Sequence, residues 1–109
     1  MKTQIILGTC SITALTADLV AKRFVGFDGA KCGAGAKALG VCDADTAVTR
    51  PAPVNFSGIL LVEAAGVIAA DADVDSDADG KAVTHNAGAI NGHTLDAAAA
   101  AGDIIRIKF

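Results

Sequence analysis

The sequence has no tryptophan or tyrosine, and its 109 residues include only four phenylalanines, two prolines and one methionine. Large side chains, aromatic rings above all, supply most of the buried area of a protein core. Hydrophobic residues make up 52% of the chain, but 24 of them are alanines and only 30 are Ile, Leu, Val, Phe or Met. Such a composition predicts a thin core, which association with a partner would stabilise. The alternative is an ordinary monomer of modest stability.

Charge of either sign is also sparse, and no basic stripe is present. Nine Lys and Arg residues are scattered among twelve Asp and Glu, for a net charge of −3. A nucleic-acid-binding surface needs clustered cations, so this function is disfavoured. The apolar run Ile5–Leu7 is shorter than the roughly 7–15 residues of a secretory signal. No stretch reaches the roughly 20 apolar residues that cross a membrane, so we expect no membrane partner.

The three cysteines, Cys10, Cys32 and Cys42, form no paired or metal-binding spacing. An odd number of cysteines is a poor disulfide framework, and a free cysteine usually behaves as a small buried hydrophobe. We therefore expect free thiols in a protein made in a reducing cytoplasm.

Alternation of polar and apolar residues dominates what remains and predicts short β-strands. The candidate strands are 11–16, 22–27, 39–42, 54–62, 81–84 and 103–109. Pro51 and Pro53 are expected just before the strand that begins at Val54. The five alanines Ala97–Ala101 favour one helical turn at most, because Gly102 follows them. Strands about ten residues apart with Gly and Asp turns predict an all-β barrel or sandwich.

A loose internal repeat recurs after about 50 residues. Phe24–Lys31 contains an Asp-Gly turn and matches Val74–Lys81, which contains another. Further along, Leu39–Val41 matches Ile90–Gly92, and Val54–Phe56 matches Ile105–Ile107. Each copy is expected to form a strand, a turn, a strand, a loop and a strand. Two such strand-turn-strand units, with the N-terminal strands, could close a small barrel.

The acidic run from Asp71 to Asp79 places aspartate at every second position before Gly80. The frame Asp75-x-Asp77-x-Asp79-Gly80 matches the first half of an EF-hand calcium loop. The twelfth position of that loop, however, is Asn86 where a bidentate Glu is needed, and no helical pattern flanks it. We favour a solvated hairpin with an Asp-Gly turn over a calcium site.

Other candidates for chemistry are weak. His85 and His93 are eight residues apart, which does not suit a metal pair on a helix, and nothing in the sequence brings Cys42 or Ser57 to either as a nucleophile. Gly33–Lys37 lacks the phosphate-loop pattern and predicts a flexible loop. We therefore expect no catalytic residues, metal or cofactor, and do not expect an enzyme.

The segments that carry strands and turns also occur in an order found in a known family. They are Phe24-Val25-Gly26-Phe27-Asp28-Gly29, Leu39-Gly40-Val41, Gly58-Ile59-Leu60-Leu61-Val62-Glu63-Ala64, Ser76-Asp77-Ala78-Asp79-Gly80-Lys81 and Gly102-Asp103-Ile104-Ile105-Arg106-Ile107. Over residues 12–109 the chain resembles the small capsid cement, or head decoration, proteins of tailed bacteriophages. The resemblance implies a β-barrel-like fold, a trimer on the outer surface of a phage capsid, and reinforcement of the shell. It implies no catalytic residues.

We therefore expect a structural virion protein that binds the major capsid protein and bridges capsid subunits. Residues 12–109 are expected to form a single β domain, and residues 1–11 an N-terminal arm or strand. The contact residues expected in the arm are Thr3, Gln4, Ile5, Ile6 and Leu7, and those in a Gly/Ala-rich loop are Lys31 and Lys37. The alternative is a carbohydrate- or host-binding module on the virion surface, although Trp and Tyr, which usually stack on sugars, are absent.

Overall fold

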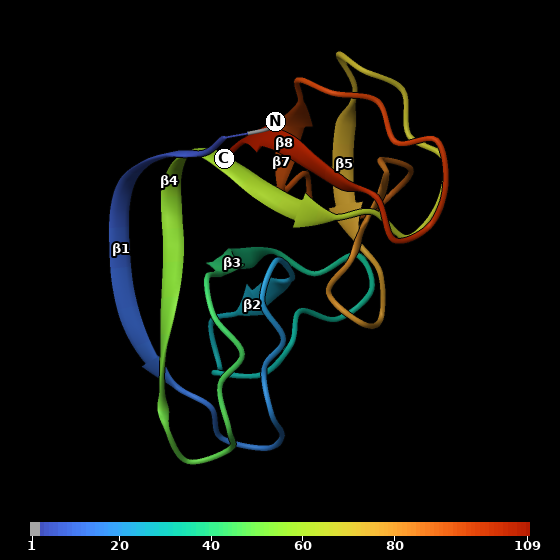
Figure 1. The fold of residues 1–109 in the computed structure, drawn as a ribbon. Coiled ribbons are helices and arrows are strands. Elements are labelled where there is room, and N and C mark those ends of the chain that lie inside the picture. Colours follow the sequence, from blue (N-terminus) through green and yellow to red (C-terminus); the bar gives the residue numbers. More distant parts are fainter. Residues whose placement is uncertain (1–2) are drawn as a thin grey trace.

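The computed structural model describes residues 3–109 and contains eight strands and no helix in that range (Figure 1). Met1 and Lys2, the start of the expected arm, lie outside the described residues. The strands are β1 Ile5–Thr13, β2 Phe24–Gly26, β3 Ala38–Cys42, β4 Pro51–Glu63, β5 Asp73–Ser76, β6 Ala82–Thr84, β7 Gly92–Thr94 and β8 Ile104–Lys108. They form one antiparallel sheet, which confirms the predicted all-β class.

Strand β4 is the centre of this sheet, because three other strands pair with it. Asn55 lies between Thr9 of β1 and Val41 of β3. Further along β4, Ile59 lies between Ile5 of β1 and the end of β8. Since β1 is continuous, it follows one edge of β4, while β3 and then β8 occupy the other edge in succession. Figure 1 shows β1 and β4 side by side as a long two-stranded ribbon.

The sheet consists of two units with the same pairing. In the first unit, β1 pairs with the beginning of β4, and in the second the end of β4 pairs with β8. The equivalent pairs are Thr13–Pro51 with Glu63–Ile104, Ile12–Ala52 with Val62–Ile105, Ser11–Pro53 with Leu61–Arg106, Cys10–Val54 with Leu60–Ile107, and Thr9–Asn55 with Ile59–Lys108. The two units therefore meet within β4, which ends one and begins the other.

The turns repeat as well. Gly26 N donates to Ala30 O across the first Asp-Gly turn, and Asp77 N donates to Lys81 O across the second. The two turn glycines, Gly29 and Gly80, have φ of 81° and 78°, a region that only glycine adopts easily. The predicted repeat of strand and turn is thus confirmed.

One register in the predicted repeat is wrong. The sequence match aligned Val54 with Ile105, whereas the pairing makes Ala52 the equivalent of Ile105 and Val54 the equivalent of Ile107. A shift of two residues keeps the same side chains facing inward, so alternation could not distinguish the two registers. The hydrogen-bonded pairing decides between them.

The second unit curls into a nearly closed barrel. The strand order β4-β8-β7-β5-β6 returns to its starting point, because Ala82 of β6 bridges Ala64 just after β4. Ala65 N donates to Ala82 O over 2.9 Å at this closure. In the first unit the corresponding contact is a longer hydrogen bond of 3.4 Å from Leu15 N to Gly29 O. The first unit is therefore the more loosely closed of the two.

Each unit has its own core, and the two cores differ in size. The first core contains Ala14, Leu19, Val25, Cys42, Ala52 and Val54, with Cys10, Ile12 and Leu39 partly buried against it. The second core has 13 buried residues, including Leu60, Ile105 and Ile107, and also takes Phe24 and Val41 from the first half of the chain. Positions equivalent to Leu60 and Ile105 hold Cys10 and Ala52 in the first core. The thin core expected from composition is thus concentrated in the first unit.

Several local expectations need correction. Pro51 and Pro53 lie inside β4 rather than before it. The backbone of Pro53 faces Asp43, which lies beyond the end of β3 and donates its N–H to the Pro53 carbonyl. Pro53 is tolerated because no strand residue on that side needs the N–H group that proline lacks. Strand β7 spans Gly92–Thr94, two residues further along the chain than the strand that the repeat placed at Ile90–Gly92. The expected limit of one helical turn at Ala97–Ala101 is confirmed, because no helical turn forms there and Ala98 exchanges backbone hydrogen bonds with Ile68.

The unequal cores predict unequal costs of truncation at equivalent positions. Leu60→Ala should lower the free energy of unfolding by about 2–5 kcal/mol, because Leu60 is fully buried and its loss leaves a cavity. Cys10→Ala, at the matching position, should cost about 1 kcal/mol or less. Urea unfolding followed by far-UV circular dichroism measures both, since the chain has no tryptophan for fluorescence. Equal losses would contradict this account of the two cores.

Candidate partner-binding surface

Strand β1 has one open edge. Among residues 3–109 it pairs only with β4, and no strand covers its other edge. Proteins usually protect such an edge with Lys, Pro or charged side chains that prevent pairing with another chain. The nine residues of β1 contain no charge and no proline. The outer edge of β1 is therefore able to accept a further strand.

Exposed apolar side chains gather in the first half of β1. Ile5, Ile6 and Leu7 expose 60%, 42% and 75% of their surface. Phe56 of β4, itself 42% exposed, places its ring over Gly8, where a Cβ would come within 2.6 Å of the ring. We call these residues, Ile5, Ile6, Leu7 and Phe56, the β1 apolar patch. Exposed apolar side chains of this density mark interaction surfaces.

The N-terminal segment is held in place by polar contacts on its inner side. The Gln4 side chain donates to Asp43 over 3.2 Å and accepts from Leu61 N over 3.2 Å. Gly58 has φ of 117°, and a Cβ there would lie 2.1 Å from the carbonyl oxygen of Ile5. Glycine is therefore required for this close approach. The predicted arm residues Gln4–Leu7 are thus docked on their own β4, with their outer edge free, and Thr3 is exposed beside them.

The two predicted contact lysines lie outside β1, and they contact different residues. Lys31 forms an exposed ion pair of 3.1 Å with Asp79 at the second Asp-Gly turn. Lys37 donates to the carbonyl oxygen of Ile90 over 2.8 Å, and its ammonium lies 5.9 Å from the centre of the Phe109 ring. The fold therefore brings the arm residues together on β4, whereas Lys31 and Lys37 have different partners.

The acidic run forms the hairpin of β5 and β6, as the sequence favoured. Its aspartates bind groups of the protein itself. Asp77 accepts from Asp79 N and Lys81 N across the turn. Burial alone would raise the pKa of Asp75, but hydrogen bonds from His85, Asn86 N and Gly88 N outweigh it and lower this pKa below its usual value.

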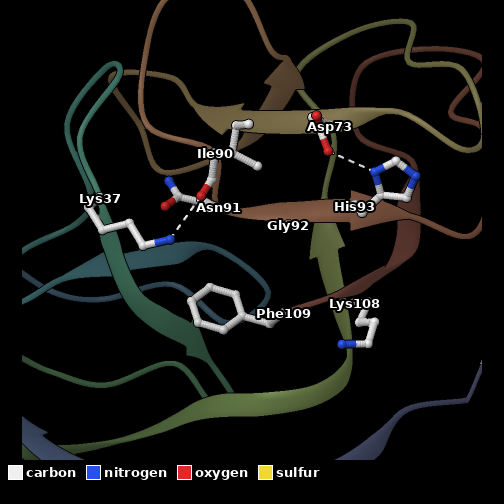
Figure 2. Close-up of a pocket in the computed structure, with 8 residues that line it drawn as sticks. All are labelled: Lys37, Asp73, Ile90, Asn91, Gly92, His93, Lys108 and Phe109. Atoms are coloured by element: carbon white, nitrogen blue, oxygen red, sulfur yellow. Dashed lines mark hydrogen bonds and ion pairs between the residues drawn. The ribbon is translucent and has the colours of Figure 1, made fainter.

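His93 lies between two aspartates of the same run. Its Nδ1 is 2.7 Å from Asp73 and its Nε2 is 2.7 Å from Asp71, and the first contact is drawn in Figure 2. Only a doubly protonated ring can donate to both carboxylates. The hydrogen bonds to Asp71 and then to Asp73 raise the pKa of His93 above its ordinary 6.5. No sequence signal identified this cluster, because the alternating aspartates resembled a metal loop.

The remaining reactive groups pack into the fold. Cys32 and Cys42 are buried, and burial raises the pKa of each thiol. Cys10 is half-buried against the first core. Within the described part of the chain, no three His, Cys, Asp or Glu side chains are arranged to hold a metal ion. Nor does any helix there have the length and apolar character to cross a membrane.

These features define a small, duplicated all-β domain that carries an open apolar strand edge. The family model for phage cement proteins matches residues 7–109, so the chain belongs to the phage cement protein family. The match confirms the resemblance and begins five residues earlier than the expected residue 12. As a cement protein, the chain is a capsid-associated structural component of a phage virion.

A solved structure has the same fold. The head fiber gp8.5 N base of bacteriophage phi29 is 18% identical, with a TM-score of 0.75 over 94% of each chain. No curated protein matches the sequence. This fold therefore tolerates extensive sequence change.

The His93 cluster predicts a pH dependence of stability. A pKa raised in the folded state contributes stability that is complete below the unfolded value of 6.5 and is lost as pH rises through the folded value. The free energy of unfolding should therefore fall as the pH rises above 6.5, and His93→Gln should flatten that fall. Proton NMR titration of the imidazole measures the pKa directly. A His93 midpoint at or below 6.5 would contradict the cluster.

Proposed function

We propose that this protein binds the outer surface of a phage capsid and stabilises the shell by bridging subunits of the major capsid protein. The observation that carries the proposal is the uncharged, open edge of β1 with its exposed apolar patch. The cement family supplies the capsid as the partner. The protein would be made in the host cytoplasm, where its three free thiols stay reduced.

Strand addition is the mechanism that this edge favours. A partner strand laid along β1 would satisfy the outer N–H and C=O groups and bury Ile5 and Leu7 in the same step. Apolar burial contributes about 25 cal/mol for each Å² removed from water. Thr3–Leu7 would then act as the arm, using its inner edge for β4 and its outer edge for a neighbour.

Many weak contacts of this kind would add up on a shell. We propose that three copies cluster into a homotrimer on the capsid surface, so that one copy cannot dissociate without its neighbours. A homotrimer would also supply burial to the thinly filled first unit. Lys31 and Lys37, both exposed, would contribute polar contacts at the rim of the interface.

Leu7→Lys tests the arm. Leu7 is 75% exposed, so the substitution should leave the fold unchanged, but its charge would be buried under an added strand. We expect at least a tenfold loss of affinity for undecorated phage heads, measured by co-sedimentation. Val67→Lys is the matched control, because Val67 is 76% exposed and lies outside β1. Full binding by the Leu7 variant, with the control unchanged, would refute the arm.

Electron cryomicroscopy of decorated heads tests the bridging geometry. We expect density on the outside of the shell, in clusters of three copies, with each copy touching at least two capsid subunits. Single copies that each touch one subunit would contradict both the trimer and the bridge.

A further inference from the structure

A cleft separate from the β1 apolar patch lies where β7 and β8 meet the segment before β3. It has a volume of about 300 Å³. Its lining residues, drawn in Figure 2, are Lys37, Asp73, Ile90, Asn91, Gly92, His93, Lys108 and Phe109. A cleft of this size is at the lower limit for small-molecule sites and accommodates one or two side chains.

The charges of this cleft favour an anion. Lys37 and Lys108 extend into it from opposite sides of the Phe109 ring (Figure 2). Lys37 uses one of its three donors on the Ile90 carbonyl, and the Lys108 ammonium group has no hydrogen-bond or ion-pair partner among residues 3–109. The Asp73 carboxylate, the acidic group of the lining, is already bound to His93. The two ammonium groups therefore remain available to a ligand.

The cleft is formed in the absence of any ligand. Asn91 is only 2% exposed, and its side chain accepts from Ala38 N and donates to the Ala36 carbonyl. These two bonds fix the backbone on both sides of Lys37. At the other wall, Phe109 N donates to Gly58 O at the centre of the sheet. A pre-formed site loses little entropy on binding.

The lining selects among anions. Phe109 and the 43% exposed Ile90 provide apolar surface between the cations, which suits a carboxylate attached to an apolar neighbour. A nucleic-acid backbone would need a longer row of cations. It would also approach Asp71, which is 95% exposed beside His93 and would repel neighbouring phosphates.

The cleft is continuous with the proposed capsid-binding edge. Lys108 pairs with Ile59 of β4, and Ile59 pairs on its other side with Ile5. These three paired residues, one on each of three neighbouring strands, therefore connect the cleft with the β1 apolar patch. A partner lying along the first half of β1 can reach both.

We propose that this cleft binds an Asp or Glu side chain, next to an apolar residue, from the capsid protein that docks along β1. The carboxylate lies between the Lys37 and Lys108 ammonium groups, and the apolar residue packs on Phe109. The identity of the partner rests on the proposed function, whereas the chemistry of the cleft can be tested on the isolated protein.

Two capped dipeptides test that chemistry. Acetyl-Glu-Leu-amide and acetyl-Gln-Leu-amide differ only in the carboxylate, and each is titrated into the ¹⁵N-labelled protein. We expect the Glu peptide to shift the amide signals of Gly92, His93 and Lys108 with millimolar affinity, and the Gln peptide to bind at least twofold more weakly. Lys108→Gln should weaken binding of the Glu peptide about two- to fivefold, as is usual for an exposed charge pair. Equal shifts with both peptides would overturn the proposal.

Arg50→Gln is the matched control. It removes the same charge from an exposed loop residue that precedes β4, whereas the cleft lies beyond the middle of that strand. If both variants weaken binding equally, the effect is one of net charge and the cleft is not the site. Head binding is measured separately. If the Glu peptide binds the cleft as expected but the Leu7→Lys variant still binds heads, the result contradicts the arm and leaves the chemistry of the cleft unaffected.

Discussion

The rest of the structure depends on the pairing of β4 with strands on both of its edges. Its first half completes the first unit against β1 and β3, and its second half begins the second unit against β8. Gly58, at the change from one unit to the next, has a φ that permits Ile5 to approach. A single strand thus supplies hydrogen bonds to both units, and its alternating inward residues contribute to both cores.

The two units have diverged in how completely they bury themselves. The second closes through Ala64 and Ala82 and is filled by Leu60, Ile105 and Ile107. The first carries smaller side chains at equivalent positions and leaves the outer edge of β1 without a partner in the described chain. The second unit is therefore the better filled, while β1 leaves backbone groups and apolar side chains exposed.

The aspartates of the acidic run around β5 stabilise the fold. The alternating aspartates bind different partners because only Asp73 and Asp75 lie within β5, whereas Asp71, Asp77 and Asp79 lie outside the strand. Asp71 and Asp73 hold His93, Asp75 holds His85 and the following loop, and Asp77 forms the turn. The carboxylates that might have formed a calcium loop are thereby distributed among separate contacts. Lys37 and Lys108 are left to give the adjoining cleft its positive charge.

The sequence by itself determined the all-β class, the two Asp-Gly turns and the inward face of Ile105 and Ile107, because these follow from local alternation and from the φ that glycine permits. The order of its strand and turn segments also indicated the family. Only the tertiary structure decided the register of the repeat, since a shift of two residues preserves the alternation of Val54 and its neighbours. The open edge of β1, the His93 cluster and the cleft at Phe109 were likewise decided by strand pairing. That pairing joins residues as far apart as Asp73 and His93, 20 positions, or Ile5 and Ile59, 54 positions, and no local pattern specifies it.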